Sequence, residues 1–259
     1  MGLGTMAPVP ASIQGPVSSV DLSADLGEIP GSEGRRLDAA LMESISTAHV
    51  ACGGHAGDPE SMRSAIDSAL RNNVALGAHP SYLDREGFGR RRQSRRPEEV
   101  VEAVGEQLAV LDDLAVALGA RVVSVKPHGA LYHDLSADTE LAAAFFEFLV
   151  TRQGSVVLDA GSRAAIRAER FGLSVVAEGF CDRRYEESGA LAPRGDANAL
   201  LVDPALAELQ ALELVRHGIT VRDARVDSLC VHSDQPAARA IASGVRAALE
   251  AAGIRVCAP

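Results

Sequence analysis

Lysine and tryptophan are almost missing from this chain of 259 residues. It contains no tryptophan, and Lys126 is the one lysine among 25 basic residues. Arginine is a planar cation that keeps its proton, whereas lysine is a compact charge whose pKa shifts readily on burial. Because this chain supplies its ordinary cations as arginine, the lone lysine is a candidate for a functional position.

Cysteine is also scarce, and its spacing matches no metal or redox motif. The four cysteines are far apart, form no Cys-x-x-Cys pair and lie mostly in apolar runs. This pattern argues against a disulfide scaffold and against a cysteine-based zinc module. We therefore expect reduced, buried thiols.

Positive charge and long apolar runs are both in short supply. The net charge is -10, which opposes attraction to nucleic acid or to an anionic membrane. No apolar run approaches the roughly 20 residues that span a bilayer. Residues 1–15 lack the cationic start and apolar segment of a signal peptide. We expect a cytoplasmic protein without nucleic-acid or membrane partners.

The apolar fraction of 47% is sufficient for one large core. A leader rich in Gly, Pro and Ser covers residues 1–18 and is expected to be flexible. Residues 19–259 then alternate short β-branched runs with longer stretches of helical periodicity, which indicates a parallel α/β domain. The expected strands span Ser19 to Ala24, Ala48 to Cys52, Val74 to Ala78, Val122 to Val125, Val156 to Leu158, Leu173 to Ala177 and Leu229 to Val231. The expected helices span Arg35 to Ser46, Pro59 onwards, Glu98 to Leu118, Asp138 to Arg152, Pro204 to Arg216 and Pro236 to Ala252.

Ionisable residues follow nearly every expected strand. They are Asp25, His55, His79, Lys126, His128, Asp159, Glu178, His232 and Asp234. In a closed barrel these positions meet at one mouth, whereas in an open doubly wound sheet they would spread along an edge. We therefore predict a seven-stranded (β/α) barrel, irregular if Ala199 to Val202 adds a further strand. Any single residue of this set could instead cap a helix or pack as a hydrogen-bonded histidine.

The loops that carry these residues are rich in glycine, which lets a backbone approach a ligand closely. Seven blocks of sequence stand out: Asp21-Leu-Ser-Ala-Asp-Leu-Gly-Glu28, Ala51-Cys-Gly-Gly-His-Ala-Gly-Asp-Pro59, Gly77-Ala-His-Pro-Ser-Tyr82, Gly87-Phe-Gly-Arg-Arg91, Val125-Lys-Pro-His-Gly-Ala-Leu-Tyr132, Glu178-Gly-Phe-Cys-Asp-Arg-Arg-Tyr185 and Cys230-Val-His-Ser-Asp-Gln-Pro236. Through these blocks the chain resembles, from about residue 20 to 255, the LamB/YcsF family, the A subunits of bacterial 5-oxoprolinases. The chain departs from the family pattern at Ser23, His49, Gly54, His133, Cys181 and Ser233. None of these departures removes a proposed site residue, but Gly54 and His133 bear on substrate identity.

The resemblance implies a barrel of the glycoside hydrolase/deacetylase type. It also implies ATP-dependent opening of the lactam ring of 5-oxoproline to glutamate, with separate B and C subunits as partners. The sequence contains no Gly-x-x-x-x-Gly-Lys-[Ser/Thr] phosphate loop. We therefore expect ATP to be a co-substrate handled mainly with the partner subunits.

Residue type and position suggest roles within that scheme. The catalytic candidates are Asp25, His55, His79, Lys126, His128, Glu178 and His232. The candidates for substrate binding are Gly53, Tyr82, Tyr132, Asp182, Arg183, Arg194 and Asp234. Arg90 and Arg91 are candidates for contact with phosphate or a partner subunit. Histidine exchanges protons near neutral pH and carboxylates can orient it, but individual acid and base roles stay open.

Two alternatives remain open at this stage. The same Asp and His residues could hold a divalent metal, as in related deacetylases, which would make the chain a deacetylase or amidohydrolase that acts alone. No His-Glu-x-x-His or His-x-His spacing supports a metal, so none is assigned. The second alternative is a subunit that binds 5-oxoproline without catalysing its hydrolysis.

Overall fold

The computed structural model of the protein describes residues 17–235 and 237–259. Nearly all of the leader expected at 1–18 lies outside the described residues, as does Pro236, the expected start of the last helix. No helix in the described ranges is long and apolar enough to cross a membrane.

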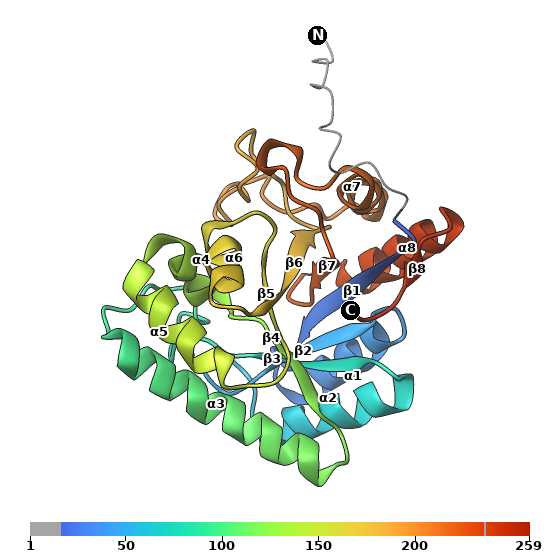
Figure 1. Ribbon diagram of the computed structural model, residues 1–259. Coiled ribbons are helices and arrows are strands. Elements are labelled where there is room, and N and C mark those ends of the chain that lie inside the picture. The colour runs from blue at the N-terminus through green and yellow to red at the C-terminus, as the bar shows by residue number, and fades with distance from the viewer. Residues whose placement is uncertain (1–16, 236) are drawn as a thin grey trace.

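Seven parallel strands form a closed barrel at the centre of the domain (Figure 1). They are β1 (Ser19–Leu26), β2 (Thr47–Ala51), β3 (Ala75–His79), β4 (Val122–Val125), β5 (Ser155–Asp159), β6 (Ser174–Phe180) and β7 (Ser228–His232). Each strand pairs with the next along the chain, and β1 closes the ring by pairing with both β2 and β7. The predicted barrel and its seven strands are confirmed.

Two short segments pair outside this ring. β8 (Arg255–Val256) pairs with Ser19 and Val20 at the start of β1, before the part of β1 that pairs with β7. The segment Ala199 to Val202, considered above as an extra strand, is not one. It folds back along the loop after β6, where Leu200 and Arg183 form an isolated antiparallel bridge, so its backbone bonds to that loop and not to the barrel.

Alternation along β1 explains why the barrel has a polar interior. Side chains point to opposite faces at successive positions of a strand. Leu22 and Leu26 pack outwards into an apolar cluster with helix residues. Asp21, which points to the other face, accepts hydrogen bonds from Thr47 at 2.7 Å and Ser228 at 2.6 Å inside the barrel. The strand therefore buries both faces, one against helices and one against polar groups from neighbouring strands.

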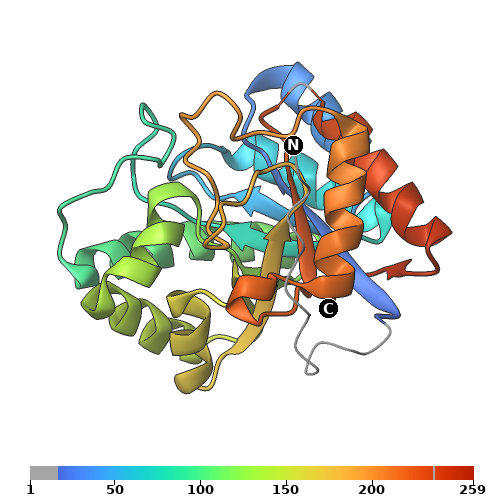
Figure 2. The same ribbon diagram turned by 90° about the horizontal axis from the view of Figure 1, so that it is seen from above.

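Helices surround the barrel, as Figure 2 shows from above. They are α1 (Gly31–Met42), α2 (Pro59–Asn72), α3 (Pro97–Ala117), α4 (Gly129–Ala137), α5 (Thr139–Val150), α6 (Arg163–Arg170), α7 (Pro204–His217) and α8 (Ala238–Ala251), with a short 3-10 turn η2 (Thr220–Arg222). Two large apolar clusters fill the space between strands and helices. α4 and α6 were missing from the sequence-based prediction because both are short, at 9 and 8 residues.

The start of α2 follows the capping pattern expected from its sequence. The Asp58 carboxylate accepts hydrogen bonds from the backbone N–H groups of Glu60 and Ser61, and Ser61 Oγ accepts one from Asp58 N. Pro59 occupies the first helical position, where the missing N–H costs nothing. This cap fixes the direction of the loop that leads from β2 into α2.

We predict that Asp58→Ala destabilises the protein by about 1 kcal/mol, because two N–H groups lose their acceptor. For a chain of this size the thermal midpoint should fall by about 2–4 °C. Asp58→Asn is the matched control, since its side-chain oxygen can still accept from both groups. Equal midpoints for the two variants in thermal unfolding would contradict the role given to this cap.

Candidate active site

The single lysine lies in a buried ion cluster at the carboxyl end of the barrel. Lys126 Nζ is 2.8 Å from Asp25 Oδ1 and 2.8 Å from Glu178 Oε1, and it donates to Cys230 Sγ at 3.1 Å. Lys126 and Asp25 each expose 3% of their surface, and Glu178 exposes none. We call Asp25, Lys126 and Glu178 the central ion cluster.

Strand order explains why these residues meet. Asp25 and Cys230 lie near the ends of the neighbouring strands β1 and β7, and Glu178 lies in β6 on the other side of β7. Lys126 directly follows β4, which lies across the barrel from β1 and β7. Because the barrel is closed, the long lysine side chain reaches over the mouth to both carboxylates.

Burial and charge act in opposite directions on these groups. Burial opposes the charged forms, but the neighbouring carboxylates hold the pKa of Lys126 well above its usual range. Burial likewise would raise the pKa of Asp25, yet its neighbours His79 and Lys126 hold it well below the usual value. Burial raises the pKa of Glu178 in spite of Lys126. The lysine is therefore a fixed positive charge at the mouth and not a proton carrier.

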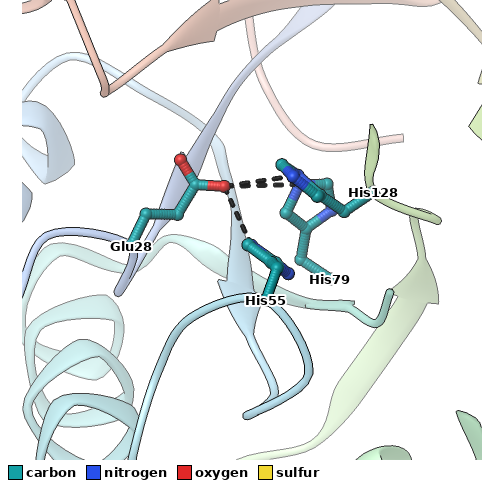
Figure 3. A group of neighbouring side chains, drawn as sticks. All are labelled: Glu28, His55, His79 and His128. Atoms are coloured by element: carbon teal, nitrogen blue, oxygen red, sulfur yellow. Dashed lines mark hydrogen bonds and ion pairs between the residues drawn. The ribbon is translucent and has the colours of Figure 1, made fainter. Parts of the chain in front are cut away.

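Beside this cluster, one carboxylate and three histidines converge, as Figure 3 shows. Glu28 Oε1 lies 3.1 Å from His55 Nε2, 3.4 Å from His128 Nδ1 and 3.8 Å from His79 Nε2. His79 Nε2 and His128 Nδ1 are 2.9 Å apart. The rings of His55 and His128 stack with centroids 3.6 Å apart. We call Glu28, His55, His79 and His128 the histidine cluster.

Backbone carbonyl groups orient two of these rings. His79 Nδ1 lies 2.7 Å from the carbonyl oxygen of Lys126, and His128 Nε2 lies 2.9 Å from that of Phe88. Phe88 has a φ of 54°, a conformation that non-glycine residues rarely adopt. Its loop is held close to the cluster, because a Cβ on Gly89 would meet His55 Cβ at 2.9 Å. The loop around Phe88 thus covers the histidines tightly.

A second carboxylate orients His232 at the rim. Asp182 accepts from the backbone N–H of His232 at 2.8 Å and lies 2.9 Å from its Nδ1. The imidazole stacks on Phe180, with ring centroids 5.5 Å apart. With Nδ1–H donated to Asp182, the other ring nitrogen of His232 is left to act as an acceptor.

Arginine side chains complete the rim. Asp234 binds Arg90 at 2.5 Å and Arg194 at 2.7 Å. Arg183 donates from Nη2 to the carbonyl of Ala192 at 2.6 Å, and its buried Nε has no hydrogen-bond partner in the part of the chain that the structure describes. Arg183 therefore has donors to spare for a ligand.

These groups surround a pocket of about 430 Å³, within the roughly 300–1,000 Å³ typical of small-molecule sites. Predicted site residues that line it are Asp25, His79, Arg90, Lys126, His128, Tyr132, Arg183, Arg194 and His232. His55, Glu178, Asp182 and Asp234 lie behind this wall, each in contact with a residue that lines it. Tyr132 donates to Glu178 at 2.9 Å and so joins the wall to the central ion cluster.

Four further predicted positions do not line the pocket either. Tyr82 is buried and donates to Asp134 at 2.8 Å, away from the lining residues. Arg91 is largely exposed beside Asp84. Gly53 lies in the loop after β2, with a φ of 99° and its N–H bonded to Ala56. Asp159, at the end of β5, pairs with Arg222 at 2.5 Å and does not reach the cluster.

Three residues of the site were not predicted from the sequence. Glu28 ends one of the family motifs but had no expected role, although it closely follows β1, as the other site residues follow their strands. Cys230 was expected only to be a buried thiol, and it touches Lys126. His49 was noted only as a departure from the family pattern, and its Nδ1 lies 3.9 Å from Asp25. Only the strand-end position of Glu28 was a usable signal.

Comparison with known proteins agrees with this architecture. The model of the LamB/YcsF family matches residues 20–259. The chain is 44% identical over 248 residues to the A subunit of the 5-oxoprolinase of Methylococcus capsulatus, covering 93% of this chain and 95% of the relative. It is 41% identical over 246 residues to the corresponding protein of Pyrococcus abyssi, covering 92% and 96%.

Solved structures show the same relationship. The lactam utilization protein from Thermus thermophilus superposes with a TM-score of 0.83 at 38% identity, over 93% of this chain and all of the other. The catalytic domain of a peptidoglycan N-acetylglucosamine deacetylase from Eubacterium rectale shares the fold alone, at a TM-score of 0.52 and 12% identity, over 99% and 93% of the two chains. From the family model and these relatives together, the chain belongs to the LamB/YcsF family.

Proposed function

We propose that this chain is the A subunit of an ATP-dependent 5-oxoprolinase and that its barrel mouth binds and opens the lactam. The observation that carries the proposal is the pocket lined by residues of the central ion cluster. The chain that contains this pocket matches, over 93% of its length, a relative named as the A subunit of a 5-oxoprolinase. The name of such relatives supports partner subunits, which we propose to be the B and C subunits.

The substrate needs a cation for its carboxylate. Arg183 lines the pocket and uses one N–H group on Ala192, which leaves other donors of its planar fork for a carboxylate. Arg194 and Arg90 also line the pocket, but both already bind Asp234. We propose that Arg183 binds the substrate carboxylate. The ion pairs of Asp234 with Arg90 and Arg194 hold the rim in shape.

Ring opening needs a base and a stabilised oxyanion. A water molecule adds to the lactam carbonyl carbon, the ring C–N bond breaks and the nitrogen takes up a proton. His232, oriented by Asp182, is the candidate that removes the proton from water, since an Asp–His pair leaves the outer ring nitrogen basic. Lys126 supplies a fixed positive charge near the developing oxyanion, where water is largely excluded.

ATP supplies the driving force, because hydrolysis of a barely strained amide near neutral pH gains little free energy. In the proposed cycle the amide oxygen receives the γ-phosphoryl group, which makes the carbon a better electrophile. The first water adds to that carbon and the C–N bond breaks, which leaves an acyl phosphate. A second water then hydrolyses the acyl phosphate to glutamate and free phosphate. The sequence has no phosphate loop of the Gly-x-x-x-x-Gly-Lys type. We place the nucleotide with the partner subunits, or at the interface that they form with this chain.

Reconstitution tests the proposal directly. We expect the chain alone to turn over neither ATP nor 5-oxoproline, and the mixture with the neighbouring B and C subunits to convert 5-oxoproline to glutamate only with ATP. Robust ATP hydrolysis by the isolated chain would contradict the division of roles. Amide hydrolysis by the isolated chain without ATP would instead support a deacetylase or amidohydrolase that acts alone.

We predict that Lys126→Arg lowers turnover of the reconstituted complex on the order of 100-fold or more. The ammonium makes three contacts within 3.1 Å in a closed space, and the longer planar guanidinium cannot reproduce them. Arg239→Lys on the exposed face of α8 is the matched control and should keep its activity. The thermal midpoint is measured in parallel, so that loss of turnover is separated from unfolding.

If Lys126→Arg folded and kept at least half of the wild-type turnover, Lys126 would not be part of the catalytic site. If a folded His232→Gln variant also kept at least half of the wild-type turnover, the alternative of a subunit that binds substrate without catalysing its hydrolysis would be supported.

Arg183→Gln is predicted to raise the KM for 5-oxoproline on the order of 10-fold or more, because the substrate carboxylate loses a charge-assisted hydrogen bond. The neighbouring Arg184 is exposed, so Arg184→Gln controls for the change in net charge. Steady-state kinetics at saturating ATP gives KM and kcat separately. An unchanged KM in Arg183→Gln would exclude it as the carboxylate anchor.

A further inference from the structure

The histidine cluster contains more hydrogen-bond acceptors than donors. A carbonyl oxygen can only accept, so His79 Nδ1 and His128 Nε2 must carry the hydrogens that point at the carbonyls of Lys126 and Phe88. In the neutral rings, His79 Nε2 and His128 Nδ1 are then bare lone pairs. These two atoms face each other at 2.9 Å, and Glu28 Oε1 lies within 3.8 Å of both.

Acceptor atoms brought together in this way need a hydrogen or a cation between them. All four side chains are buried, with 7% of Glu28 and of His128 exposed and less of His55 and His79. Little bulk water therefore reaches the lone pairs. The geometry points to a site for one divalent transition-metal ion bound by Glu28 Oε1, His55 Nε2, His79 Nε2 and His128 Nδ1.

The spacing of the ligand atoms fits such an ion. At a metal–nitrogen distance of about 2.0–2.1 Å, a tetrahedral centre holds its ligands about 3.4 Å apart. The two histidine nitrogens that face each other are 2.9 Å apart, and Glu28 Oε1 lies 3.1, 3.4 and 3.8 Å from the three histidine nitrogens. These four distances lie on both sides of the tetrahedral value. All four atoms lie within 4.8 Å of one another. Small rotations of the side chains would bring them to tetrahedral positions.

The surroundings of the rings are also those of a metal site. Histidine ligands usually donate their other ring N–H to a carbonyl or carboxylate, which fixes the tautomer. His79 and His128 both do so through main-chain carbonyls. His55 Nδ1 is buried without a partner among the described residues, so that ring is positioned by its contacts with Glu28 and His128. Imidazole with one carboxylate favours zinc and its first-row neighbours over magnesium or calcium.

A second group of possible ligand atoms lies nearby, but it does not lack a cation. Asp25, Cys230 and His232 also lie within reach of a common centre. There the ammonium of Lys126 already contacts Asp25 at 2.8 Å and Cys230 at 3.1 Å, so the chain supplies the cation itself. The two positions are adjacent, since His79 Nε2 lies 3.4 Å from Asp25 Oδ2. A metal in the histidine cluster would lie against the pocket that His79 and His128 line.

The test uses the full chain with any affinity tag removed, stripped with a chelator, dialysed and then given Zn²⁺ alone. We expect about one zinc per chain by elemental analysis and a thermal midpoint that rises with Zn²⁺ concentration. Co²⁺ in place of Zn²⁺ should give the intense visible absorption of a four-coordinate site. Neither 5-oxoproline, ATP nor partner subunits are needed, so failure here is independent of the proposed function.

Variants separate the two groups of ligands. The double variant His55→Gln/His128→Gln should bind Zn²⁺ on the order of 100-fold more weakly or worse. His232→Gln, from the second group, and His217→Gln, at the half-buried end of α7, should bind it as the wild type does. The cobalt spectrum of the wild type decides the matter if the double variant fails to fold.

Three results would overturn the assignment. The first is a wild-type chain that takes up no zinc and shows no thermal shift, which would mean that a shared proton satisfies the histidines. The second is full zinc binding by a folded double variant. The third is loss of zinc in His232→Gln alone.

Discussion

The ion pairs of Lys126 with Asp25 and Glu178 are the interaction on which the rest of the site depends. They join residues from three separate strand regions across the mouth of the barrel, at 2.8 Å to each carboxylate. Removing one partner of such a buried pair typically costs about 3–5 kcal/mol, because the other charge is left without compensation. The cluster therefore holds the carboxyl ends of β1, β4 and β6 in place. It also positions the loops that carry the histidines and arginines.

The barrel interior supports this cluster with further polar groups. Below Asp25 on the same strand, the Asp21 carboxylate is surrounded by hydroxyl groups of Thr47 and Ser228. Burial raises the pKa of Asp21 although those hydroxyl groups lower it. A column of fixed polar groups thus runs along the barrel to the pocket. Such preorganised groups need no rearrangement when charge develops at a bound ligand.

Two positions for positive charge lie side by side at the pocket. The chain fills one with Lys126, while the other is surrounded by Glu28 and three histidines. Asp25 connects them, because its two oxygens face Lys126 Nζ and His79 Nε2 respectively. A ligand in the pocket would meet both these charges and the arginines of the rim.

Much of this architecture follows from the sequence by itself. β-branched runs that alternate with helical segments determine seven parallel strands, and ionisable residues after those strands indicate a closed barrel with one functional mouth. The single lysine among 25 basic residues marked Lys126, because a rare residue type in a strand-end position carries local information. Capping at Asp58 was visible for the same reason, since its partners are within three residues.

Only the tertiary structure decided which strand-end residues meet. Asp159 and Glu178 are register partners on β5 and β6, yet Asp159 turns to Arg222 and Glu178 to Lys126. Tyr82 lies in a motif but points to Asp134. The histidine cluster depends on contacts over 27 to 100 positions of sequence, from Glu28–His55 to Glu28–His128, and on main-chain carbonyls that orient the rings. These residues therefore form no motif with a fixed spacing in the sequence. Closure of the barrel and the directions of the side chains bring the atoms together, whatever their separation along the chain.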